Sequence, residues 1–169
     1  MQKYNIAVVG ATGKVGREIL QILEQRDFPI NELYCLASSR SKGTKLEFKD
    51  KEVVVEDLAE FDFAKIQIGL FSPGAKVSAE YVPKATGKGC LVIDNTSYFR
   101  MKDDVPLIIP EVNGNVLNDF FENKKRSNII SNPNCSTIQM VVALKPIHDA
   151  AIIKRIVVST YQSVSGAGK

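Results

Sequence analysis

The chain has 169 residues, 44% of them hydrophobic and 24% charged, which is ordinary for a globular protein and allows one full domain with a modest remainder. Its formal net charge of +3 is small, and no basic run is long enough to indicate nucleic-acid binding. No apolar stretch approaches the ~20 residues of a membrane span, and the chain leads directly into an expected strand, so we expect neither a membrane partner nor a signal peptide.

The first 37 residues predict one βαβ unit. The apolar run at residues 4–9 is typical of a buried parallel strand, and Gly10 follows it at once. Apolar residues at helical spacing favour a helix over residues 13–25, and residues 32–37 supply a second strand. The crossover between the two strands should be right-handed.

The middle of the chain continues this alternation less regularly. Residues 45–48 and 53–55 resemble short strands, and we expect them to form a hairpin beside the main sheet. Further strands are predicted at residues 66–71, 91–93 and 128–130, with a helix at 75–85 and another apolar run at 107–109. Strands that alternate with helices indicate an α/β fold of the Rossmann type, with a mostly parallel sheet.

The last part of the chain predicts a helix from Cys135 to about Ala150 and then a strand over residues 152–161, which are rich in Ile, Val, Ser and Thr. That strand leads into a turn of small residues at 162–169, where a natural end would be unusual. We therefore expect the chain to be a fragment of a longer protein.

A glycine-rich turn follows the first strand, with Gly10, Gly13 and Gly16 in the pattern G-x-x-G-x-x-G. Such a turn lets a backbone approach phosphate closely, and the N-terminus of the helix that follows attracts a pyrophosphate. The position between an apolar strand and an amphipathic helix predicts a dinucleotide site. A structural turn without a ligand is the alternative.

The end of the second strand indicates which dinucleotide is bound. An NAD site typically has a carboxylate there to hold the ribose 2′-hydroxyl. Here Arg40 lies among serines that include Ser41, and a guanidinium can hold a 2′-phosphate. The sequence therefore favours NADP(H), with an ordinary basic loop as the alternative.

Cys135 is the strongest candidate for chemistry. It follows the turn-forming residues 132–134 at the start of the expected helix, where free N–H groups and the helix dipole favour thiolate over thiol. With a nicotinamide site, such a thiol indicates aldehyde oxidation or acyl reduction through a thioester. The alternative is a buried structural cysteine.

The other cysteines, Cys35 and Cys90, lie in or beside expected strands and are predicted to be core residues. Three cysteines without metal-ligand spacing fit a reducing cytoplasm, and we expect no metal site.

Several ordered segments together resemble aspartate-semialdehyde dehydrogenase. They are residues 9–13 (VGATG), 37–41 (ASSRS), 94–100 (DNTSYFR), 105–107 (VPL), 110–113 (PEVN), 132–137 (NPNCST) and 159–168 (STYQSVSGAG). The resemblance implies NADPH-dependent reduction of L-aspartyl 4-phosphate to L-aspartate 4-semialdehyde with release of phosphate. That step serves the biosynthesis of lysine, threonine, methionine and diaminopimelate. It also implies a homodimer or homotetramer of the full-length protein.

Carried over by position, the resemblance implies an NADP-binding domain over residues 1–131 and the incomplete start of an α+β catalytic and dimerisation domain over residues 132–169. Cys135 matches the nucleophile, whereas Arg100, which matches a phosphate-binding arginine, joins Asn134 and Gln162 as substrate contacts. The implied cofactor contacts are Gly10, Thr12, Gly13, Lys14, Val15, Arg40, Ser41, Ser72, Ser165 and Gly166. From the residues alone, Arg100 could also be a surface cation and Gln162 a polar residue at a strand end.

The chain departs from the family in one respect, because the acid–base histidine of the family lies beyond residue 169. The one histidine present, His148, is about thirteen residues from Cys135, or ~20 Å along a helix, so we place it outside the site. We therefore expect this chain alone to be inactive.

Two rival interpretations remain open. An N-acetyl-γ-glutamyl-phosphate reductase performs the same chemistry, but its cysteine segment typically reads Gly-Cys-Tyr-Pro-Thr, where this chain has Asn134, Cys135, Ser136 and Thr137. The other rival is a stand-alone NADP-binding module without catalysis.

Overall fold

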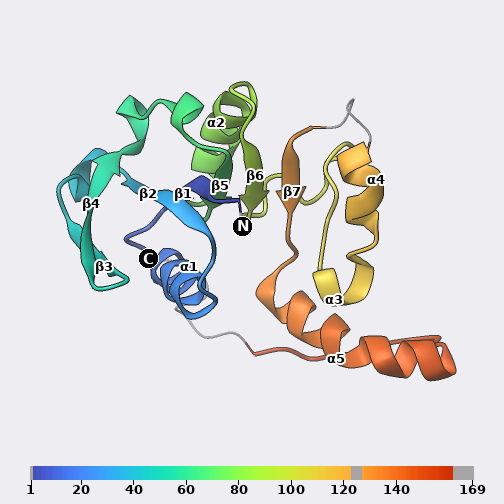
Figure 1. Ribbon diagram of the computed structural model, residues 1–169. Coiled ribbons are helices and arrows are strands. Elements are labelled where there is room, and N and C mark those ends of the chain that lie inside the picture. The colour runs from blue at the N-terminus through green and yellow to red at the C-terminus, as the bar shows by residue number, and fades with distance from the viewer. Residues whose placement is uncertain (1, 123–126, 162–169) are drawn as a thin grey trace.

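The computed structural model describes residues 2–122 and 127–161, which form one twisted sheet with helices on both faces (Figure 1). The strands are β1 (Tyr4–Val9), β2 (Ile30–Ala37), β3 (Lys45–Phe48), β4 (Lys51–Asp57), β5 (Ile68–Phe71), β6 (Leu91–Asp94) and β7 (Ile129–Ser131). The α-helices are α1 (Lys14–Gln25), α2 (Ala75–Thr86), α3 (Pro110–Asn113), α4 (Val116–Glu122) and α5 (Cys135–Ala151). Three short 3₁₀ helices are η1 (Ser39–Ser41), η2 (Leu58–Glu60) and η3 (Phe63–Lys65).

The sheet has the strand order β3-β4-β2-β1-β5-β6-β7. All neighbours are parallel except the β3–β4 hairpin, which is antiparallel. The predicted α/β fold of the Rossmann type is therefore confirmed. The expected hairpin is present, and it continues the main sheet rather than standing beside it, because β4 pairs with β2.

Alternate residues of β1 point to opposite faces of the sheet and so enter two separate cores. Val8 packs in a cluster with Leu20 and Leu23 of α1, while Val9 belongs to a cluster that includes Val82 of α2. Both faces of the central strand are therefore covered, which explains why its residues 6–9 are all apolar rather than alternating.

The β7 edge carries a third, smaller core. Ile130 of β7 is buried against Ile108 and against Phe120 of α4. The apolar run at residues 107–109 does not form a named strand but makes a single parallel bridge, between Leu107 and Ser131. It stops there because Pro110 begins α3, and a proline fits the first turn of a helix.

The strand predicted at residues 152–161 is wrong, because these residues carry no strand pairing in the structure. They follow α5 as an irregular segment, and the Val157 side chain is 86% exposed. Backbone N–H and C=O groups of a strand require a neighbouring strand, and no strand of the described part of the chain pairs with them. High β-propensity was therefore not enough to form a strand here.

Gly16 is predicted to be indispensable for the packing of α1 on β1. A Cβ at this position would lie 2.2 Å from the Gly10 carbonyl oxygen and 2.7 Å from the Ala11 Cα. Gly16→Ala should lower the free energy of unfolding by about 1–3 kcal/mol, the usual cost of overpacking. Gly13→Ala is the matched control, because its Cβ would meet the Gly10 oxygen at 3.3 Å. Urea unfolding measures both, and equal stability of the two variants would contradict the prediction.

Candidate active site

The predicted site residues follow the carboxyl ends of parallel strands, so they gather along one edge of the sheet. The turn after β1 and the turn after β5 touch. Gly10 has a positive φ of 84°, and a Cβ there would lie 2.8 Å from the Ser72 carbonyl oxygen. A glycine is therefore needed at position 10 for both its conformation and the close approach of these two turns.

The first turn of α1 is suited to an anion. Gly13 is the N-cap residue and offers no side chain to the N–H groups of the turn. Lys14 and Val15, the first two residues of the helix, are exposed, and Thr12 is half-buried beside them. Free N–H groups at a helix N-terminus form an anion site.

Arg40 lies after β2 in the short helix η1, with Ser41 as its neighbour. The Arg40 side chain is exposed, and none of the ion pairs found in the described residues involves it. Lys42 of the same loop is instead engaged with Glu60 at 2.5 Å. Among the described residues, the Arg40 guanidinium therefore has no ion-pair partner, and it lies at the position where the sequence predicts a 2′-phosphate.

Arg100 is fixed by two backbone carbonyls from different loops. Its Nε donates to the Asn132 oxygen at 3.0 Å, and its Nη2 donates to the Asn95 oxygen at 3.0 Å. Asn132 Nδ2 also donates to Asn95 Oδ1 at 2.5 Å, so the loops after β6 and β7 are joined directly. In the part of the chain that the structure describes, the other N–H groups of the guanidinium fork make no hydrogen bond and can serve another acceptor.

Cys135 is the first residue of α5 and is exposed, as predicted. The N-cap is Asn134, whose Oδ1 accepts from the Ser136 backbone N at 3.0 Å and from its Oγ at 2.6 Å. The Cys135 Sγ lies 3.8 Å from the same oxygen. The capping bond starts the helix at the cysteine, which places the thiol at the positive end of the α5 dipole.

Cys35 and Cys90 are buried in the core, as the sequence predicted. Burial raises the pKa of the Cys35 thiol to about 11 and that of the Cys90 thiol to about 12, because the charged thiolate loses its hydration. These two cysteines are therefore inert, and Cys135 is the accessible thiol.

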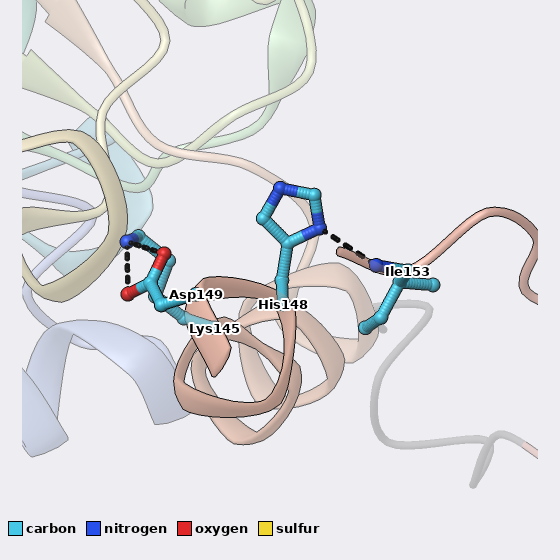
Figure 2. A network of polar contacts seen from close by, with 4 residues as sticks. All are labelled: Lys145, His148, Asp149 and Ile153. Carbon is cyan, nitrogen blue, oxygen red and sulfur yellow. Dashed lines mark hydrogen bonds and ion pairs between the residues drawn. The ribbon is translucent and has the colours of Figure 1, made fainter. Parts of the chain in front are cut away.

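His148 lies in the last turn of α5 (Figure 2), whereas Cys135 is the first residue of that helix. Its Nδ1 accepts a hydrogen bond from the Ile153 backbone N at 3.3 Å, next to an ion pair between Lys145 and Asp149 at 2.6 Å. The placement of this histidine at a helix end, away from the site, agrees with the prediction.

Three predicted contacts, Gln162, Ser165 and Gly166, lie outside the described residues. Sequence reasoning in turn did not single out Asp94, which is fully buried at the end of β6, or the backbone carbonyls that accept hydrogen bonds from Arg100. The one signal in the sequence was the polar turn that begins at Asp94, directly after an apolar strand.

A surface hollow lies elsewhere, on β2 and β4, and it is lined in part by the carboxylates of Glu32, Glu52 and Glu56. It contains none of the predicted site residues. Tyr34 in this hollow donates a hydrogen bond to Glu32, which is the main reason why the pKa of Tyr34 is raised to about 12.

No group of three or more His, Cys, Asp or Glu side chains in the described ranges could hold a metal ion. Within the same ranges, no helix is both long and apolar enough to cross a bilayer.

A Rossmann-type sheet with a phosphate-suited glycine turn and an exposed cysteine at a helix start defines a dinucleotide-binding domain joined to a thiol site. Residues 5–120 match the family model described as semialdehyde dehydrogenase, NAD binding domain. The chain therefore belongs to the semialdehyde dehydrogenase family.

Individual relatives confirm the resemblance to aspartate-semialdehyde dehydrogenase. The chain is 58% identical to the enzyme of that name from Legionella pneumophila over 98% of its own length and 46% of the relative. It matches the crystal structure of aspartate semialdehyde dehydrogenase II complexed with ASA from Vibrio cholerae with a TM-score of 0.94 and 52% identity, over 100% of this chain and 49% of that one. The chain thus spans about half the length of the relatives it matches.

A more distant relative has been solved with a cofactor. The crystal structure of aspartate semialdehyde dehydrogenase with NADP from Candida albicans matches with a TM-score of 0.72 and 26% identity, over 90% of this chain and 48% of that one.

Alkylation of the folded chain should modify one thiol of the three. At pH 8, iodoacetamide should react with Cys135, while Cys35 and Cys90 stay unmodified because burial both shields them and raises their pKa. Intact-mass spectrometry should show one adduct for the native chain and three after denaturation. Two or three adducts on the native chain would contradict the buried placement of the other two cysteines.

Proposed function

We propose that this chain is the cofactor-binding and nucleophile-bearing part of an aspartate-semialdehyde dehydrogenase. The full enzyme would reduce L-aspartyl 4-phosphate to L-aspartate 4-semialdehyde with NADPH and release phosphate, in the biosynthesis of lysine, threonine, methionine and diaminopimelate. A cytoplasmic homodimer or homotetramer is part of the same proposal. The names of the relatives support it, since they are 52% to 58% identical to nearly all of this chain.

One contact in the structure supports this function most directly. Arg100, the predicted phosphate-binding residue, donates to the carbonyl oxygen of Asn132, which lies in the turn immediately before the Cys135 helix. The phosphate-suited cation and the thiol therefore belong to two loops that are bonded to each other. An acyl phosphate needs both at once, a nucleophile for its carbonyl carbon and a cation for its phosphate.

In the proposed reaction the Cys135 thiolate attacks the acyl carbon of the substrate. The carbon–oxygen bond to phosphate breaks, a thioester forms, and the phosphate leaves with its charge held by the free N–H groups of Arg100. When bound, NADPH supplies the hydride that brings the acyl carbon to the aldehyde level. The carbon–sulfur bond then breaks, so that the aldehyde departs and Cys135 returns to the thiolate.

The cofactor proposal depends on the loop after β2. The residues there fit a 2′-phosphate, because Arg40 is exposed and free of ion pairs in the described part of the chain, while no carboxylate stands at that position. The relative from Candida albicans that was solved with NADP supports the same choice.

We expect the chain to bind NADP(H) more tightly than NAD(H). Arg40→Ala should weaken NADP binding by about 10- to 100-fold, the worth of a hydrogen bond to a charged group, with little effect on NAD. Lys42→Ala is the matched control from the same loop, since its ammonium is paired with Glu60. Calorimetry of both cofactors against the three proteins measures this, and equal affinities of the unmodified chain for NAD and NADP would refute the preference.

We expect Cys135→Ser to reduce turnover of the longer gene product by orders of magnitude with cofactor binding retained, because a serine hydroxyl stays protonated without a strong base. Cys35→Ala is the control, because it alters a core thiol away from the site. The assay follows NADPH formation from aspartate semialdehyde and phosphate. Near-normal activity of Cys135→Ser would end the thioester proposal.

The 169-residue chain belongs in the same assay. We expect it to be inactive, since a positioned acid–base group typically contributes ~10²–10⁴-fold and His148 stands at the far end of α5. Comparable rates for the chain and the longer product would show that the chemistry resides in other residues.

A further inference from the structure

Asp94 is a fully buried carboxylate at the carboxyl end of β6. No ion pair found in the described residues includes it. Hydrogen bonds satisfy the charge instead. Oδ1 accepts from Ser78 Oγ of α2 at 2.9 Å and from the Thr96 backbone N at 3.2 Å, and Oδ2 accepts from Thr96 Oγ1 at 2.8 Å. A buried charge is costly, so its retention in a core position invites a functional reason.

The bond to the Thr96 backbone connects Asp94 to Arg100. The N–H of Thr96 and the C=O of Asn95 belong to the same peptide group, which is planar and points these two atoms in opposite directions. Asp94 holds the N–H side, and the C=O side accepts from Arg100 Nη2 at 3.0 Å. The carboxylate therefore sets the direction of the carbonyl that orients the guanidinium.

The second anchor of Arg100 is also tied to Asp94. The backbone N of Asn132 donates to the Asp94 carbonyl oxygen at 3.2 Å, and the Asn132 carbonyl then accepts from Arg100 Nε at 3.0 Å. Thr96 extends the arrangement, because its Oγ1 accepts from the Tyr98 backbone N at 3.4 Å while it donates to Asp94. Both acceptors of the guanidinium thus stand on backbone that Asp94 holds.

We propose that Asp94 is a positioning residue, which aims the Arg100 guanidinium toward the Cys135 loop by fixing the peptide between Asn95 and Thr96. The positioning role rests on the proposed function in one respect, namely that the group bound by Arg100 is a phosphate. The orientation of Arg100 itself follows from the hydrogen bonds. If the peptide turns over, Arg100 keeps one anchor and loses the other.

A purely structural role for Asp94 would act on the whole sheet instead. Loss of the Asp94 carboxylate would then speed proton exchange throughout the sheet by a similar factor. With a positioning role, exchange at Arg100 should speed up more than exchange in the sheet. Exchange of the Arg100 Nη2 protons with water separates the two, because Nη2 donates to the Asn95 oxygen, the anchor on the peptide that the Asp94 side chain holds. The backbone amide of Val8, which is fully buried in the central strand β1, is the internal reference for global opening.

The test uses the ¹⁵N-labelled 169-residue chain, with the Arg100 Nη2–H signal identified by its loss in Arg100→Lys. The variants are Asp94→Ala and Asp94→Asn. The neutral amide of asparagine offers one acceptor oxygen to the Ser78 and Thr96 donors, which in the unmodified chain bind two carboxylate oxygens. Asp62→Ala and Asp62→Asn are matched controls. The Asp62 Oδ1 likewise accepts a backbone N–H, from Ala64 at 3.0 Å, but Asp62 is exposed at the N-cap of η3.

The exchange rate of the Arg100 Nη2 protons, relative to that of Val8, should rise about tenfold or more in Asp94→Ala, the factor that loss of a charge-assisted hydrogen bond corresponds to. Asp94→Asn should show a smaller rise and the Asp62 variants none. If the ratio of the Arg100 exchange rate to the Val8 exchange rate is unchanged in Asp94→Ala, the proposal is overturned. If Asp94→Ala does not fold, an unchanged ratio in Asp94→Asn overturns it instead. Failure of both Asp94 variants to fold overturns it too, since the carboxylate would then serve the fold itself.

Titration of the unmodified chain with inorganic phosphate, followed on the same Arg100 signal, tests the proposed function separately. A shift of the signal that weakens in Asp94→Asn supports both proposals. A chain whose Arg100 signal ignores phosphate counts against the function, while the exchange ratio still decides the role of Asp94.

Discussion

The parallel pairing of β1 on both of its sides is the constraint on which the rest of the structure depends. A strand with neighbours on both edges and helices on both faces must be apolar throughout, and Ile6 to Val9 are at most 1% exposed. Parallel strands also end at the same edge, so each following loop begins beside the others. The glycine turn, the Arg40 loop and the Cys135 turn lie along the same edge of the sheet for that reason, although more than a hundred residues separate the first from the last.

The sequence predicted best those parts that are determined locally. The strand β1 and the helix α1 follow from hydrophobic periodicity, and the start of α5 follows from the capping side chain of Asn134. The short helices α3 and α4 were not predicted, because helices of four and seven residues have too few turns to display a period. Residues 152–161 show the opposite failure, since their composition favours a strand but strand formation needs a partner that the described chain does not supply.

The candidate site divides in the same way. The residues proposed to face ligands, such as Arg100 and Cys135, could be identified from their motifs. The residues that hold them could not, because their partners are remote in sequence. Ser78, which donates to Asp94, lies sixteen positions earlier in the sequence, in α2. Asn132, whose carbonyl accepts from Arg100, lies thirty-two positions later in the sequence than that arginine. Only the folded sheet shows that the polar turn at Asp94 is a support rather than a surface loop.

The guanidinium of Arg100 illustrates why such a support matters. Its fork has five N–H donors, and two of them are spent on the carbonyls of Asn95 and Asn132. Those two bonds fix the plane of the group, so the remaining donors point in one direction before any anion arrives. A flexible arginine would have to lose its rotational freedom on binding, at a cost of about 2 kcal/mol of side-chain entropy. The neutral carbonyls achieve this orientation without cancelling the positive charge, whereas a carboxylate partner in contact with the guanidinium would reduce its attraction for phosphate. Asp94 therefore acts best where the structure places it, one peptide group away, fixing the dipole that holds the cation while its own charge is satisfied by Ser78 and Thr96.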